Sequence, residues 1–96
     1  MSPWYALGVS DIEQVRKALK KTKLPSWVES ASAEPMIDHT GDPAVRVTIV
    51  VRKDREDVVK DGAALSELSR KIHLAIDAAG VHLFPYTRFV GASEAA

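Results

Sequence analysis

The sequence predicts an α+β fold, a two-layer sandwich in which two helices cover one face of a three-stranded sheet. Two stretches of the chain have apolar residues at helical spacing, and three are rich in the β-branched and aromatic residues that strands favour. These stretches follow one another in the order α-β-β-α-β, and two amphipathic helices need an apolar sheet face on which to bury their stripes. The 96 residues predict a single domain, since a chain of this length buries one small core.

The first helix is expected at about residues 11–22. Ser10 and Glu13 have the spacing of a capping box, in which the serine hydroxyl and the glutamate each bind a free amide at the start of a helix. Pro25 disfavours helical geometry in the residue before it, so the helix ends ahead of that position. The stripe that this helix would bury consists of Ile12, Val15 and Leu19.

The two ends of the chain are expected to lie outside the core. Residues 1–9 contain Trp4 and Tyr5 next to a proline and a glycine, which predicts an N-terminal arm. This arm either lies extended on the domain or reaches a neighbouring molecule. Residues 91–96, GASEAA, predict a flexible tail.

The first two strands are expected at residues 27–39 and 44–53, joined by the turn residues of the segment HTGDP. Small and polar residues dominate the first of them, and Pro35 suits either an edge strand or a bulge at that position. The second strand alternates strictly between two kinds of side chain, which fixes its register. Its core-facing residues are expected to be Val45, Val47, Ile49 and Val51.

A charged segment, KDREDVVKDG, comes next and predicts a loop or a loosely wound turn. Asp61 can then cap a second helix, and Gly80 supplies the left-handed stop at its end. The apolar positions with the helical period are Leu65, Leu68, Ile72, Ala75, Ile76 and Ala79. The final strand, HLFPYTRFV at residues 82–90, carries aromatic side chains on both of its sides.

Two properties of this last strand have alternatives: its neighbour in the sheet, and the side of the strand that packs on the helices. The crossover through the second helix allows it to lie beside the first strand, in an antiparallel sheet, or beside the second, in a mixed sheet; we expect the antiparallel arrangement. If Leu83 and Phe89 pack on the helices, then Phe84, Tyr86 and Arg88 lie on the uncovered face.

Composition and charge exclude several classes of protein. Thirteen basic and thirteen acidic residues cancel, which argues against a strong field around the whole molecule. There is no cysteine, so disulfides and thiolate chemistry are excluded. No run of apolar residues is long enough for a membrane helix, and the start of the sequence lacks the features of a secretory signal. These features predict a cytoplasmic protein.

An RNA-binding module is the alternative function that the sequence suggests. The order of elements is similar to part of the KH type of RNA-binding domain, but the chain has no GxxG loop, so this similarity is limited to topology. RNA binding would therefore depend on a basic stripe of the first helix together with arginines of the second strand, although a solvated helix face is the ordinary explanation of such a stripe. The residues concerned are Arg16, Lys17, Lys20, Lys21, Arg46 and Arg52.

No catalytic or metal-binding motif is visible, so we expect neither an enzyme nor a cofactor. Asp38, His39 and Asp42 lie close together in the hairpin turn, where acidic residues are common for conformational reasons. His73 and Asp77 are four residues apart on the second helix, and helical surface pairing explains their spacing.

The aromatic side chains on both sides of the last strand favour a protein-binding function. Tyrosine, phenylalanine and arginine are enriched in protein interfaces. The predicted contact residues are Phe84, Tyr86, Arg88, Val50, Trp4 and Tyr5. We therefore predict a small non-enzymatic protein that associates with itself as a homodimer or serves as the accessory partner of a larger protein. An antitoxin-like or immunity-like role suits its size.

Three segments of the chain together resemble a set of small uncharacterised bacterial proteins. They are GDPAVRVTIVVRKD, the helix that ends at Gly80 and the closing PYTRF. The resemblance implies a compact bacterial accessory protein in which Asp42 and Pro43 form a turn. The residues of the last strand that match are Pro85, Tyr86, Arg88 and Phe89, and the resemblance assigns a function to none of them.

Overall fold

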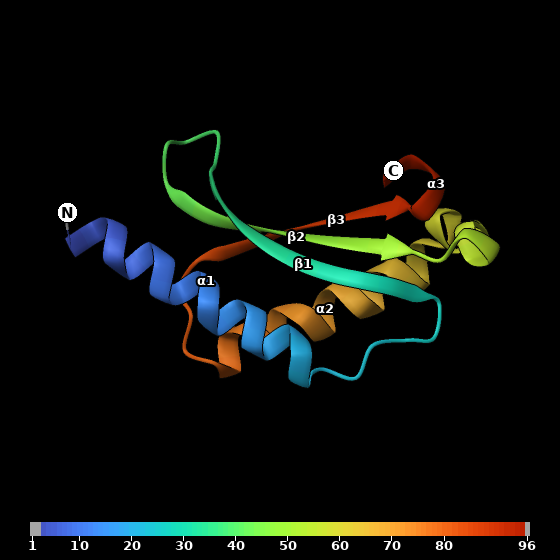
Figure 1. Cartoon of the computed structure of the whole chain (residues 1–96), viewed down its shortest axis with the longest axis horizontal. Coiled ribbons are helices and arrows are strands. Elements are labelled where there is room, and N and C mark those ends of the chain that lie inside the picture. The colour runs from blue at the N-terminus through green and yellow to red at the C-terminus, as the bar shows by residue number, and fades with distance from the viewer. Residues whose placement is uncertain (1–2, 96) are drawn as a thin grey trace.

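The chain forms an α+β fold with a three-stranded mixed sheet (Figure 1). The computed structural model describes residues 3–95, and for residues 3–10 and Ala95 it describes only the backbone. The elements are α1 (Pro3–Lys21), β1 (Val28–Ile37), β2 (Pro43–Val51), the 3-10 helix η1 (Lys53–Lys60), α2 (Gly62–Ala78), β3 (Phe84–Gly91) and α3 (Ala92–Ala95). The five predicted elements follow one another as expected, and η1 and α3 are additions to them.

The sheet has the strand order β1-β2-β3, with β1 antiparallel and β3 parallel to β2. Our expectation that the last strand lies beside the first is therefore wrong. The central strand is the most apolar one, and its residues with 0% exposure are Val45, Val47, Ile49 and Val51. Each outer strand contains a proline, Pro35 in β1 and Pro85 in β3. Because proline has no N–H to donate to a ladder, β1 and β3 are suited to the edges.

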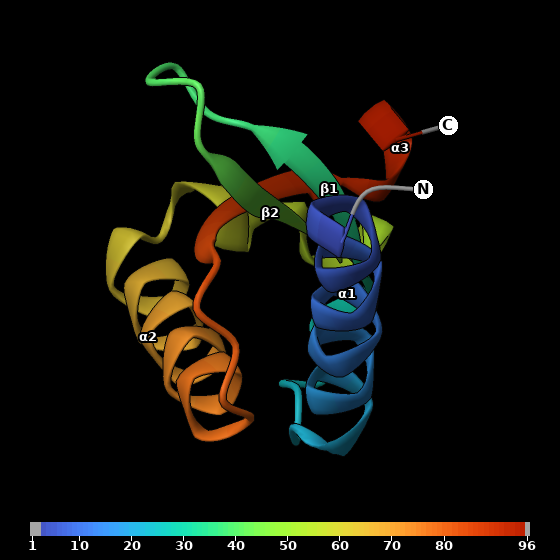
Figure 2. The same ribbon diagram turned by 90° about the vertical axis from the view of Figure 1, so that its left-hand side faces the viewer.

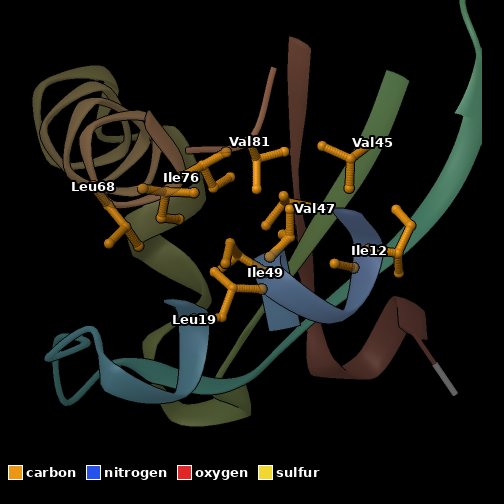
Figure 3. Close-up of a cluster of buried hydrophobic side chains, with 11 residues drawn as sticks. Ile12, Leu19, Val45, Val47, Ile49, Leu68, Ile76 and Val81 are labelled. Carbon is orange, nitrogen blue, oxygen red and sulfur yellow. The ribbon is translucent and has the colours of Figure 1, made fainter. Parts of the chain in front are cut away.

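Both long helices lie on the same face of the sheet (Figure 2). α1 contacts β1, α2 contacts β3, and the two helices also contact each other. The apolar side chains between the helices and this covered face form one cluster (Figure 3). The helix positions that the sequence correctly places in the core are Ile12, Val15, Leu19, Leu68, Ile72 and Ile76. Ala79, expected on the same stripe, is exposed because α2 ends just before it.

α1 begins at Pro3, well before the predicted start at residue 11. Residues 3–9 form its first turns, so the predicted arm is wrong for this part of the chain. Proline is favoured at the start of a helix, where its missing N–H costs no hydrogen bond, and a glycine such as Gly8 costs a helix only about 1 kcal/mol. Ser10 lies inside the helix, so the predicted capping box is also wrong.

β1 is an edge strand, as expected, but its irregularity is not at Pro35. Its register with β2 runs without a break from Ser30 to Ile37 and shifts between Val28 and Ser30. The proline fits this ladder because its missing N–H would point away from β2.

α2 starts and ends where the sequence predicts. The Asp61 side chain accepts a hydrogen bond from the Ala64 amide at 3.2 Å and so caps the helix. Gly80 has a φ of 78°, the left-handed conformation that stops a helix at little steric cost for glycine.

Short helices form in two segments, one expected to be a charged loop or a loosely wound turn and the other expected to be a flexible tail. The charged segment after β2 forms η1, in which Val58 is 4% exposed and anchors the segment to the domain. Residues 92–95, expected within a flexible tail, form the single turn α3. The Ser93 hydroxyl donates a hydrogen bond to Glu56 of η1 at 2.6 Å, and the Glu56 side chain lies against Gly91. This contact fixes the end of β3 beside η1.

Candidate functional site: the open face of the sheet

The face of the sheet opposite the helices, here called the open face, is defined by the strand register. Each strand contributes every second residue to this face, and these residues are called the column of that strand. The columns are Ser30, Ser32, Glu34 and Met36 of β1, Ala44, Arg46, Thr48 and Val50 of β2, and Phe84, Tyr86, Arg88 and Val90 of β3. The β1–β2 hairpin loop and α3 rise on this side at opposite ends of the sheet (Figures 1 and 2). The chain itself therefore bounds the open face at both ends.

The structure places four of the predicted contact residues on the open face. Leu83 and Phe89 pack against the core. This is the alternative for which we expected the other side of β3 to lie on the uncovered face. The four residues are Phe84, Tyr86, Arg88 and Val50. Trp4 and Tyr5 lie in α1, and their side chains fall outside the described part of the structure.

The β3 column carries the aromatic side chains of the open face. Phe84 is 57% exposed, and its ring centroid lies 4.8 Å from that of Tyr86. Phe84 also meets the ring of His73 nearly edge-on, with 5.9 Å between centroids. His73 belongs to α2, so this aromatic cluster reaches around the β3 edge towards the helices.

A long hydrogen bond links the aromatic cluster to the hairpin loop. The Tyr86 hydroxyl donates to Asp38 Oδ2 at 3.5 Å. Partial removal from water raises the pKa of Tyr86, and the negative charge of Asp38 adds to this effect. Hydrogen bonds, above all the one from the Thr40 side chain, lower the pKa of Asp38. At neutral pH the pair therefore consists of a protonated phenol and an ionised carboxylate.

The open face has opposite character on its two sides. The β1 column contains two serines, Glu34 and a single apolar residue, Met36, whereas the β3 column contains the aromatic rings, Val90 and Arg88. Between them, Arg46 Nη1 lies 3.8 Å from Glu34 Oε1. This ion pair is exposed, so it adds little to stability. One side of the open face is thus polar and acidic, and the other is aromatic and basic.

The basic residues predicted for RNA binding do not gather on one surface. Arg46 lies on the open face, but Arg52 lies at the far end of the sheet and donates to both carboxylate oxygens of Asp54, at 3.1 and 2.9 Å. The cations of α1, on the helix side of the sheet, are Arg16, Lys17, Lys20 and Lys21. The helix and strand cations therefore belong to separate surfaces.

The acidic residues of the hairpin turn have a conformational role. Asp38 Oδ1 accepts hydrogen bonds from the Thr40 amide at 2.9 Å, the Thr40 hydroxyl at 2.6 Å and the Asp42 amide at 3.0 Å. These bonds close the turn around Gly41, whose φ of 87° is unfavourable for other residues. Within residues 3–95, no three His, Asp or Glu side chains are grouped so that they could hold a metal ion.

Sequence reasoning missed the contact between Tyr86 and Asp38 and a groove between α1 and the outer edge of β1. The first joins residues 48 positions apart in the chain, and the second lies between the consecutive elements α1 and β1. The first depends on the parallel register, which brings the start of β3 to the hairpin end of β2 and which we did not expect from the sequence. The signal for the second is the edge position of β1 beside the basic side of α1.

Comparisons with known proteins give no relative from which a role of the open face could be inferred. No protein-family model matches the chain, and it has no significant match among the curated proteins or the solved structures. Among the described residues, no helix is both long and apolar enough to span a membrane.

Proposed function

We propose that the protein is a small non-enzymatic protein-binding module that acts through the open face, and that its partner is a second copy of the same chain. The observation that carries this proposal is the aromatic pair of β3, in which Phe84 is exposed and Tyr86 is half-buried. Phe84 remains 57% exposed although it packs against Tyr86, and neither α1 nor α2 covers this face. Covering the ring with apolar protein surface is favourable by about 25 cal/mol per Å².

The opposite character of the two sides of the open face supports a second copy as the partner. A twofold axis parallel to β2 would bring the β1 column of one copy over the β3 column of the other. Glu34 of each copy would then face the side of the sheet that carries Arg88 of the other. Each contact across such an axis occurs twice, so the charges complement each other without a second kind of protein.

The size of the open face supports an association of modest strength. Three strands about 4.8 Å apart and eight residues with a rise of about 3.3 Å give a face of roughly 15 by 25 Å. Even with the hairpin loop and α3 at its ends, a dimer would bury less than the roughly 1,600 Å² of a standard interface. We therefore expect a dimer that dissociates on dilution. In an antitoxin-like or immunity-like role, the dimer would dissociate and the open face of each copy would bind a larger protein instead.

Replacing Phe84 and Tyr86 together with serine tests the proposal. Size exclusion with light scattering should show a wild-type mass that rises towards twice 10.5 kDa with concentration, and a double variant that stays at the mass of one chain. Leu74→Ser is the matched control, because Leu74 is 60% exposed on α2, away from the open face. This control should associate like the wild type, and thermal unfolding should show that both variants keep their fold.

Unchanged association of the double variant would overturn the proposal. A monomeric wild-type protein that carries nucleic-acid absorbance through purification would favour RNA binding instead. In that case the bound RNA should be released steeply as salt is raised, because cations that neutralise phosphates release counterions.

A further inference from the structure

The outer edge of β1 has backbone groups that point away from the sheet. At the hairpin, the Asp38 amide donates to the Asp42 carbonyl. Counting back along β1 from Asp38, every second residue therefore bonds to β2. The residues between them, which include Ala31, Ala33 and Pro35, direct their backbone groups outwards. Pro35 has no N–H, so the outward residues beside α1 that offer both a donor and an acceptor are Ala31 and Ala33.

A side chain of α1 reaches this edge and shows its direction. Arg16 Nε donates to the Ala33 carbonyl at 3.2 Å, which agrees with a carbonyl that points away from β2. Arg16 Nη1 is held at the same time by Glu13 at 2.9 Å. Because the Arg16 side chain is 48% exposed, an incoming backbone amide can replace it at the Ala33 carbonyl.

A groove of about 620 Å³ lies between α1 and this edge. Its α1 wall includes the exposed side chains of Lys17 and Lys20, and Leu24 adds apolar surface. Its β1 wall, residues 31–33, carries only small side chains. Small residues on the strand leave space for another chain beside it. Glu13 also lines the groove but is paired with Arg16, so Lys17 and Lys20 make the space favourable for negative charge.

We propose that this groove binds an extended acidic peptide segment, which adds to the sheet as a fourth strand beside β1. The backbone of the peptide would pair with the outward groups of Ala31 and Ala33, as in other cases of strand addition. Side chains on one side of a strand recur about every 6.7 Å, and Lys17 and Lys20 are about 4.5 Å apart along the helix axis. Carboxylates at alternate positions of the peptide are therefore suitably spaced to reach both lysines.

Charge argues for a different polypeptide rather than a second copy at this edge. If β1 paired with β1 of another copy, the two α1 helices would bring Lys17 and Lys20 of both copies to the same seam, where like charges repel. Pairing of β1 with the β3 edge of another copy would leave further edges free and would not close into a dimer. Nucleic acid would satisfy the lysines but would not use the outward row of N–H and C=O groups.

A labelled peptide of alternating threonine and glutamate tests the proposal by fluorescence anisotropy with the full-length protein. Threonine favours the extended conformation, and strict alternation puts every carboxylate on one side of the strand. We expect saturable binding that weakens as salt rises, together with slower hydrogen exchange at the Ala31 and Ala33 amides. A peptide of the same composition with its glutamates in one block should bind at least about tenfold more weakly.

Charge reversal in the groove provides the matched protein variants. Lys17→Glu combined with Lys20→Glu should weaken binding of the alternating peptide by at least about tenfold. Lys53→Glu combined with Lys60→Glu makes the same change in net charge on η1 and should bind like the wild type. Ala31→Pro removes one outward N–H while it leaves the β1–β2 bonds intact, and it should also weaken binding.

Three results would overturn the proposal: equal loss in the two lysine variants, equal binding of the block peptide, or unchanged exchange at Ala31 and Ala33. Tighter binding of oligothymidylate than of the alternating peptide would overturn it in favour of single-stranded nucleic acid. The variant with Phe84→Ser and Tyr86→Ser should still bind the peptide. The proposals for the groove and for the open face can therefore fail independently.

Discussion

The two faces of the sheet consist of alternate residues of the same strands, yet they differ in burial and in chemistry. On the covered face, the four residues of β2 with 0% exposure are Val45, Val47, Ile49 and Val51. On the open face, the positions between them are the half-buried Arg46, Thr48 and Val50. α1 and α2 keep water from the first set, whereas neither of them covers the second (Figure 2).

The covered face holds the fold together, and the open face contributes little to the buried cluster. The main buried cluster contains side chains of α1, α2, the covered face and Val81, and none of the open-face columns. Substitutions on the open face should therefore change what the protein contacts more than how stably it folds.

The largest expected difference in stability is between valine-to-alanine substitutions on the two faces of β2. Val47→Ala should lower the free energy of unfolding by about 2–3 kcal/mol, because it removes buried methyl groups and leaves a cavity. Val50→Ala should lower it by about 1 kcal/mol or less, because Val50 is only half-buried. Urea unfolding at a protein concentration low enough to keep the chain monomeric measures both values. Equal losses would mean that the open face is part of the core.

A smaller effect of opposite sign is expected at Thr87, on the covered side of β3. Its hydroxyl oxygen is buried and has no hydrogen-bond partner among the described residues. Thr87→Val replaces the hydroxyl by a methyl group of similar size, so it should raise the free energy of unfolding by about 1 kcal/mol. Thr48→Val, the matched change on the open face, should alter it by less than about 0.5 kcal/mol. Destabilisation by Thr87→Val would show that the hydroxyl has a partner in solution.

The smallest effect concerns the pH dependence of the open face. The folded state raises the pKa of Tyr86, so this contribution to stability is present below the ordinary tyrosine pKa and is lost as pH rises through the folded value. Asp38→Asn removes the negative charge near the phenol and should lower the Tyr86 pKa in an absorbance titration. Asp54→Asn, on η1, should leave the titration unchanged. An unchanged Tyr86 pKa in Asp38→Asn would show that the two side chains do not interact in solution.

The covered face could be predicted from the sequence because its signals are local. The alternation in β2 and the spacing of Leu68, Ile72 and Ile76 each lie within one element, and burial follows directly from them. The start of α1 could not be predicted in the same way. Pro3 is compatible with an arm and with the first turn of a helix, and Ser10 and Glu13 match a capping box that the longer helix does not use.

The open face could be predicted only in part, because it depends on contacts between distant segments. Both sides of residues 82–90 carry aromatic rings, so alternation alone does not show which side faces the helices. The register settles this, since Phe89 stands beside Ile49 on the covered face. The strand order is also non-local, and the central place of β2 follows from comparing the apolar content of all three strands rather than from any one of them.

The most direct test of the central claim is the mass of the untagged wild-type protein, measured by light scattering over a wide range of concentration. Binding of a second copy to the open face predicts a mass that rises from 10.5 kDa towards twice that value, with no nucleic-acid absorbance. It also predicts that the rise is absent when Phe84 and Tyr86 are replaced by serine. A wild-type mass that stays at one chain at every concentration would contradict this account.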